Sequence, residues 1–206
     1  MKNYILPTIG MLALVGTSAS AASLNISGDI NTSNGGTGSA FAGGLEYVFD
    51  GGNTGTLSIT LTNTTSASIG GYLTGFVFNI DSADAGASAT LFSTTDADFL
   101  DTGAESASPF GMFDAGAAIG ANWAGGGNPA GGIAVGITES FQFTITASDA
   151  GSLDSMSFVG LDGSDFAVRF RGLNGGGSDK LLTTIPTPGT GALALLGLGV
   201  ASRRRR

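Results

Sequence analysis

Three aspartates in the middle of the chain, Asp96, Asp98 and Asp101, carry the oxygen ligands that Ca²⁺ prefers. The full D-x-D-x-D-G loop with its distal glutamate is missing. Aspartate also favours turns, because its side chain bonds nearby backbone N–H groups. Two interpretations therefore stay open, a structural calcium site or solvated turn residues. The same choice applies to two further pairs, Asp81 with Asp84 and Asp162 with Asp165.

The single tryptophan of the chain, Trp123, is the candidate for stacking on a sugar ring. It lies in a glycine-rich stretch, where an exposed ring could meet a ligand. A lone tryptophan is also a frequent packed anchor of a core or loop, so both interpretations stay open. Tyr47 and Tyr72 are the aromatic residues that could assist it.

Catalysis is not expected, because the sequence contains no histidine and no cysteine. Zinc sites built from these residues are excluded, and a serine nucleophile would lack a histidine base. A glycosidase needs two carboxylates at a defined separation, and no spacing singles out a pair from Glu46, Glu105, Glu139 and the aspartates. We expect no catalytic residue and no organic cofactor, and a glycan hydrolase is the least favoured function.

The charge of the chain is uneven along its length. Without Lys2 and the four arginines at 203–206, three basic residues remain, Arg169, Arg171 and Lys180, against all sixteen acidic ones. A central region with a net charge of −13 repels nucleic acid. Arg169 and Arg171 fall on the polar face of a predicted strand, where we expect them to pair with carboxylates across the sheet.

The elements that must position these residues are strands. Apolar and polar residues alternate with a period of two in residues 57–62, 141–146 and 166–171, which predicts half-buried strands of an antiparallel sheet. Residues 72–80 are more continuously apolar and predict a central strand, and residues 23–30 and 45–49 are weaker candidates.

Turn residues separate these segments. Asp50-Gly51-Gly52-Asn53 predicts a hairpin loop, and residues 148–156 predict at most a short helix. Residues 96–132 show no alternation, so we expect loops across one end of the fold with at most a short edge strand. The pattern predicts an all-β protein, an antiparallel two-sheet sandwich.

The first 21 residues have the features of a secretory signal peptide. Lys2 supplies a positive start, residues 5–15 are mostly apolar, and Ala19-Ser20-Ala21 forms an A-x-A cleavage site before Ala22. A buried N-terminal helix is the alternative. The order of charge, apolar run and small residues favours export.

The last 21 residues combine three features. Pro186, Thr187 and Pro188 form a spacer, residues 189–201 are apolar, and the chain ends in Arg203, Arg204, Arg205 and Arg206. Arginines stay on the cytoplasmic side of a membrane. As a helix, the apolar run spans roughly 20 Å, short of the ~30 Å hydrocarbon core. It therefore suits transient retention, with a plain membrane anchor as the alternative.

This tail resembles the PEP-CTERM sorting signal of bacterial surface proteins. Pro186 and Pro188 match the two prolines of that signal, the four arginines match its terminal cluster, and Thr187 stands where the family usually has glutamate. The resemblance implies cleavage by an exosortase, a membrane protease, and delivery to the surface or the extracellular polysaccharide matrix. Residues 166–173 and 177–180 are similar to the stretch before such tails, and residues 61–64 and 75–80 resemble strands of cohesin-like sandwiches.

The sequence therefore predicts a signal peptide at 1–21, a β-sandwich of jelly-roll or cohesin-like type at 22–185 and a sorting tail at 186–206. The expected function is a noncatalytic structural or adhesive component of the cell surface, biofilm or matrix. A carbohydrate-binding module is the alternative. The expected partners are an exosortase and an extracellular polysaccharide.

Overall fold

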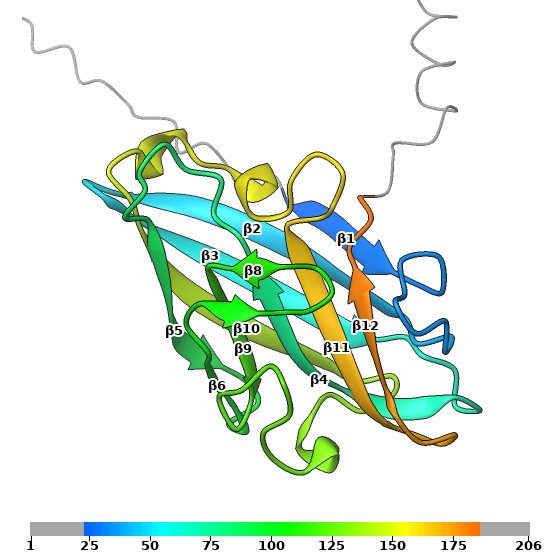
Figure 1. Ribbon diagram of the computed structural model, residues 1–206. Coiled ribbons are helices and arrows are strands. Elements are labelled where there is room, and N and C mark those ends of the chain that lie inside the picture. The colour runs from blue at the N-terminus through cyan, green and yellow to red at the C-terminus, as the bar shows by residue number, and fades with distance from the viewer. Residues whose placement is uncertain (1–22, 186–206) are drawn as a thin grey trace, which may run out of the picture.

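The computed structural model describes residues 23–185, which form two antiparallel five-stranded sheets packed face to face (Figure 1). Sheet A has the strand order β1-β2-β3-β10-β5. Its strands are β1 (Leu24–Gly28), β2 (Phe41–Gly51), β3 (Thr54–Asn63), β10 (Thr138–Thr146) and β5 (Ser88–Thr94). The antiparallel all-β architecture expected from the sequence is confirmed.

Sheet B has the order β12-β11-β4-β9-β6. Its strands are β12 (Ser178–Leu182), β11 (Phe166–Leu173), β4 (Gly70–Phe78), β9 (Ala115–Ile119) and β6 (Phe99–Asp101). A small hairpin joins β7 (Glu105–Ser106) to β8 (Met112–Phe113). Short 3₁₀ helices are η1 (Pro129–Gly131), η2 (Ala150–Ser152) and η3 (Ser155–Phe158). Within residues 23–185, no helix is long and apolar enough to span a membrane.

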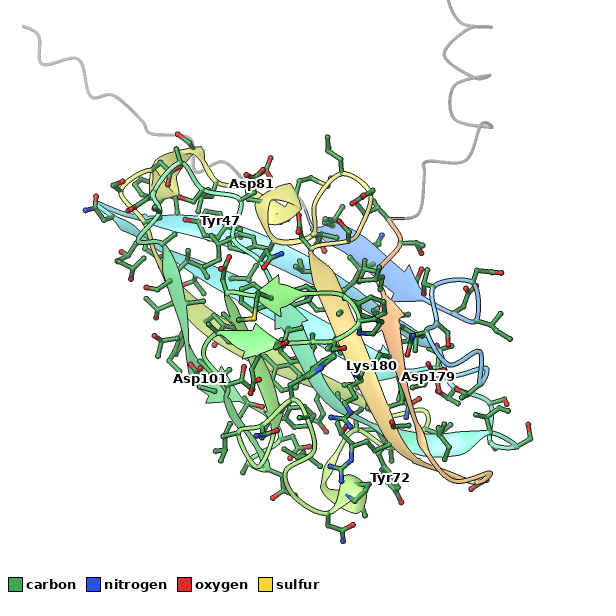
Figure 2. The ribbon with its side chains drawn as sticks, viewed as in Figure 1. Tyr47, Tyr72, Asp81, Asp101, Asp179 and Lys180 are labelled. Atoms are coloured by element: carbon green, nitrogen blue, oxygen red, sulfur yellow. The ribbon has the colours of Figure 1, made fainter. Side chains whose placement is uncertain are left out.

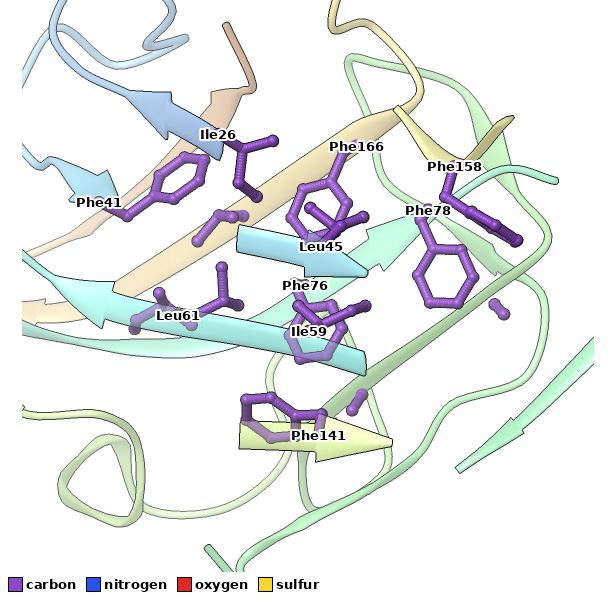
Figure 3. Close-up of a cluster of buried hydrophobic side chains, with 14 of the residues drawn as sticks. Ile26, Phe41, Leu45, Ile59, Leu61, Phe76, Phe78, Phe141, Phe158 and Phe166 are labelled. Carbon is purple, nitrogen blue, oxygen red and sulfur yellow. The ribbon is translucent and has the colours of Figure 1, made fainter. Parts of the chain in front are cut away.

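The core lies between the two sheets and is rich in phenylalanine (Figure 3). The predicted alternation is confirmed: Leu57, Ile59 and Leu61 of β3 are fully buried, and the residues between them are more exposed. Phe76 of β4 packs edge-on against Phe141 of β10, with ring centroids 4.8 Å apart. Period-two patterning therefore sends one face of each sheet into a shared apolar layer.

Strand β4 is central in sheet B, as its continuous apolar run predicts. Its inward residues face sheet A, and its outward Val77 belongs to a second buried cluster with Phe113 and Trp123. A strand covered on both faces has no polar side to alternate with. Sheet B thus carries a second apolar layer on its outer face.

The expectation for residues 96–132 is wrong in two respects. The segment contains β9, an inner strand of sheet B, and the β7–β8 hairpin lies over the outer face of that sheet (Figure 1). β9 shows no alternation because all five of its residues are buried. Four of its five residues are alanine or glycine, and β4 lies close: a Cβ added to Gly116 would lie 2.3 Å from the Phe76 carbonyl oxygen.

Other local predictions are confirmed. Gly51 and Gly52, both with positive φ, connect β2 to β3, a conformation that glycine adopts without strain. The short helix expected near 148–156 is present as η2 and η3. The two ends of the described chain meet where Ser27 and Thr184 exchange backbone hydrogen bonds of 3.1 and 2.7 Å.

Candidate functional site

The basic residues of the described chain gather on the outer face of sheet B. Arg169 and Arg171 lie on β11, and Lys180 lies on β12 directly opposite Arg169. We call these three residues the cationic strip. Figure 2 shows Lys180 beside β11 and β12, with Tyr72, the cross-strand neighbour of Arg171, towards the lower end of the same face. All three cations are partly buried.

The cationic strip binds backbone carbonyls of the covering segment. Arg169 donates to the Trp123 carbonyl, Lys180 donates to the Ser108 carbonyl, and Nη1 of Arg171 lies 2.7 Å from the Gly126 oxygen. The sequence predicts that the two arginines pair with carboxylates across the sheet. This prediction is wrong, because their side chains bind backbone carbonyls instead. The reason is the segment 105–127, which covers the polar face that sequence patterning assigns to solvent.

The three positive charges of the cationic strip repel one another. Burial lowers the pKa of Arg169, and the nearby charge of Arg171 lowers it further. Burial and the charge of Arg169 likewise lower the pKa of Lys180. Like charges directly opposite on neighbouring strands are unfavourable. The strip is thus an unusual feature in a region whose net charge is strongly negative.

Trp123 is not available for stacking on a sugar ring. Its side chain is 2% exposed and packs against the outer face of sheet B beside Val77, Ala167 and Phe113. The interpretation as an exposed ligand-binding residue is therefore corrected to that of a packed anchor. The hairpin and the loop after β9 bury the ring, and neither contact can be read from local sequence. Among residues 23–185, the buried indole Nε1 has no hydrogen-bond partner.

This burial predicts the fluorescence of the chain. Since Trp123 is the single tryptophan, we expect a blue-shifted emission that acrylamide quenches weakly in the folded protein and strongly in urea. Emission and quenching measured before and after unfolding check this. An unshifted, strongly quenched emission from folded protein would place the ring at the surface.

The candidate calcium ligands do not form one site. Asp101 accepts hydrogen bonds from the backbone N–H groups of Leu91 and Gly103, both at 2.7 Å, and Asp96 accepts one from that of Asp98 at 3.0 Å. Within residues 23–185, no group of three or more carboxylates is placed to hold a metal ion. The Asx-turn geometry of Asp96 and Asp101 matches the alternative interpretation as turn residues.

Three residues of the other two acidic pairs, Asp84, Asp162 and Asp165, also accept hydrogen bonds from the backbone or a neighbouring polar side chain. Asp84 accepts from the Ser148 N–H at 2.7 Å, and hydrogen bonds from Ser148 and Gly86 lower its pKa. Asp165 accepts from the Asn79 side chain at 2.9 Å. Asp162 accepts from the Ser164 N–H at 3.0 Å. Asp84 and Asp165 thus join segments far apart in the chain, whereas Asp162 closes a local turn.

A cleft of about 530 Å³ lies beside β6, where Asp98, Leu100, Ile119 and Asn128 are among the lining residues. Asp98 is the one ionisable side chain of that lining. General acid–base catalysis by a carboxylate pair would need a second such group. Of the two tyrosines that could assist Trp123, Tyr72 is partly exposed, and Tyr47 is buried with its hydroxyl donating to the Ala150 carbonyl at 2.8 Å.

Sequence reasoning missed Asp179, which is 2% exposed on β12. It accepts hydrogen bonds from the side chains of Ser33 and Thr37 and from the backbone N–H of Gly35 at 2.9 Å. A signal was present in the sequence. Asp179, Leu181 and Thr183 are two residues apart, so Asp179 falls on the same face of the strand as the apolar Leu181. The sorting residues at 186–188 and 203–206, like the leader, lie outside the described residues.

Comparison with protein-family models, curated proteins and solved structures finds no match to the chain.

Proposed function

We propose that the chain is an exported, exosortase-sorted, noncatalytic protein with a structural or adhesive role at the bacterial surface or in the extracellular polysaccharide matrix. The support for export is the leader at 1–21. The support for sorting is the ordered combination of Pro186-Thr187-Pro188, an apolar run and four terminal arginines. The proposed partner in sorting is an exosortase-type membrane protease, with transient membrane association through the tail.

The observation that carries the proposal is the order of three features in the last 21 residues. A Pro-Thr-Pro spacer at 186–188, an apolar run at 189–201 and four arginines at 203–206 follow one another. The same three features, in the same order, make up the sorting signal that the tail resembles.

The strand order supports a jelly-roll or cohesin-like description of the sandwich. Strands β3 and β10 pair in sheet A. Strand β4, which follows β3 in the chain, pairs in sheet B with β9, which precedes β10. Such nested antiparallel pairs, split between two sheets, are typical of jelly rolls. Carbohydrate binding by stacking on Trp123 is not part of the proposal, because that ring is buried.

Deletion of the four terminal arginines is expected to abolish processing of the tail. The intact mass of protein recovered from the native host should show loss of the leader and of the residues after about Pro188. In the deletion variant the tail should remain, because the cytoplasmic charges that hold it at the membrane are gone. A mature wild-type species that still contains Arg206 would contradict sorting and leave a membrane-tethered domain.

Two matched variants separate charge from recognition. Replacing the four arginines by lysines keeps the charge, so retained cleavage identifies membrane retention as their role and lost cleavage identifies recognition of arginine. Thr187→Glu restores the residue usual in the family, and we expect cleavage at least as complete as in the wild type.

A further inference from the structure

The cationic strip has more donors than the protein uses. A guanidinium carries five N–H donors, yet the side chain of Arg169 bonds one carbonyl in the described chain, and its Nε is buried without a partner. The Nε1 of Trp123, whose carbonyl Arg169 binds, is also buried without a partner. Unpaired buried donors are costly, so the covering segment packs against the strip without satisfying either of these two groups.

Gly125 in the covering segment lies close to both guanidinium groups. A Cβ added to Gly125 would lie 3.9 Å from Cζ of Arg171 and 4.0 Å from Nη1 and Nη2 of Arg169, and no other non-neighbouring atom is as near. Gly125 itself is exposed and has φ of +140°, a conformation that side chains rarely adopt. The exposed backbone at Gly125 thus lies next to the guanidinium groups of both arginines.

Charge also favours an anion at this position. Arg169 faces Lys180 across the strand pair and has Arg171 two residues along its own strand. The side-chain hydrogen bonds of the three cations go to neutral carbonyls. A ligand with a negative charge would offset this repulsion, and charge-assisted hydrogen bonds to a guanidinium are among the strongest in proteins.

We propose that the cationic strip is an oxyanion-binding site in which Arg169 and Arg171 together hold a carboxylate, sulfate or phosphate group. Lys180 adds attraction from the neighbouring strand. Tyr72, partly exposed and opposite Arg171, borders the lower side of the site. The site does not depend on sorting. The choice of a uronic acid residue of a matrix polysaccharide as the source of the carboxylate rests on the proposed function.

Trp123 reports directly on this site, because it is the single tryptophan and its carbonyl binds Arg169. The experiment titrates the full-length chain in mild detergent with sodium glucuronate, sulfate or phosphate at constant low ionic strength. We expect a saturable change in fluorescence with at least one oxyanion and none with glucose. The most effective titrant identifies the source, a uronate or a free inorganic ion. No saturable change with any of the three would overturn the proposal.

The key variant is Arg171→Gln, which removes the charge from the more peripheral arginine. It should weaken binding by about tenfold or more, the equivalent of one charge-assisted hydrogen bond. Thr60→Glu on the exposed face of sheet A changes the net charge equally and should leave the affinity within about twofold. Equal losses in both variants would mean that only net charge matters and would refute a specific site. If circular dichroism shows Arg171→Gln to be unfolded, Lys180→Gln provides the same comparison, with a loss of at least about threefold expected from its charge.

Discussion

Asp179→Ala is expected to lower the free energy of unfolding by about 3 kcal/mol at neutral pH, because it removes a buried carboxylate that accepts hydrogen bonds from several partly buried donors. The carboxylate joins β12 to the loop between β1 and β2. Figure 2 shows Asp179 beside that loop. Ser33 Oγ donates to it at 2.7 and 2.8 Å, and the Lys180 N–H does so at 2.8 Å. The same loop is held by the Asn34 N–H, 2.9 Å from the Lys180 carbonyl oxygen.

This contribution should depend on pH. Burial raises the pKa of Asp179, but hydrogen bonds from Thr37, Ser33 and the backbone lower it more, so the pKa lies below its ordinary value. A group whose pKa is depressed by folding stabilises the protein above its unfolded pKa, about 3.9 for aspartate. That stabilisation is lost as the pH falls through the folded pKa. The gap between wild type and Asp179→Ala should therefore be full near pH 7 and shrink in strong acid.

Urea unfolding of the full-length chain, followed by circular dichroism at pH 7 and pH 3, measures both effects. Asp162→Ala is the control, because Asp162 is exposed and its described partners are the neighbouring Ser164 groups. It should change stability by less than about 1 kcal/mol. Equal stabilities of Asp179→Ala and Asp162→Ala at pH 7 would show that the buried network does not stabilise the fold.

Phe76→Ala should destabilise the protein by about 4 kcal/mol, the middle of the range for a fully buried aromatic residue. The ring lies in the centre of the core (Figure 3), stacked on Phe166 of its own sheet with centroids 5.8 Å apart. It also meets Phe141 and Phe143 of the opposite sheet edge-on, at 4.8 and 6.0 Å. Truncation removes contacts to both sheets and leaves a cavity that rigid strands cannot fill.

The same substitution at Phe92 is the matched control, since that side chain is 56% exposed on β5. Phe92→Ala should change stability by no more than about 0.5 kcal/mol. Thermal or urea unfolding of the two variants against wild type measures the difference. A loss below about 1 kcal/mol in Phe76→Ala would mean that the two sheets do not pack as described.

The strands could be predicted where burial is one-sided. In β3 and β10, an apolar face meets the core and a polar face meets solvent, so alternation of single residues marks both elements. The method fails for β9, where both faces are buried and every residue is small or apolar. Alternation of apolar and polar residues identifies a strand only when one of its faces is exposed to solvent. Whether a face is exposed depends on the tertiary structure.

The candidate site shows the same division. The sequence indicates that Arg169 and Arg171 share the polar face of a strand, and β11 confirms this placement. It cannot indicate that Trp123 and the glycines after it cover that face, because the contact joins segments some 45 residues apart. The sequence also suggests a metal site at Asp96, Asp98 and Asp101. These residues are close in sequence, but in the described structure their carboxylates are not placed together to hold a metal ion.

By itself, the sequence determined the all-β class, the main strands, their turns and the strongly acidic central region, because these depend on local periodicity and composition. Only the tertiary structure decided that the lone tryptophan is buried, that Asp179 binds a distant loop and that three cations gather on one face. Burial and charge neighbourhood are set by contacts between residues far apart in the chain, and no local pattern encodes them.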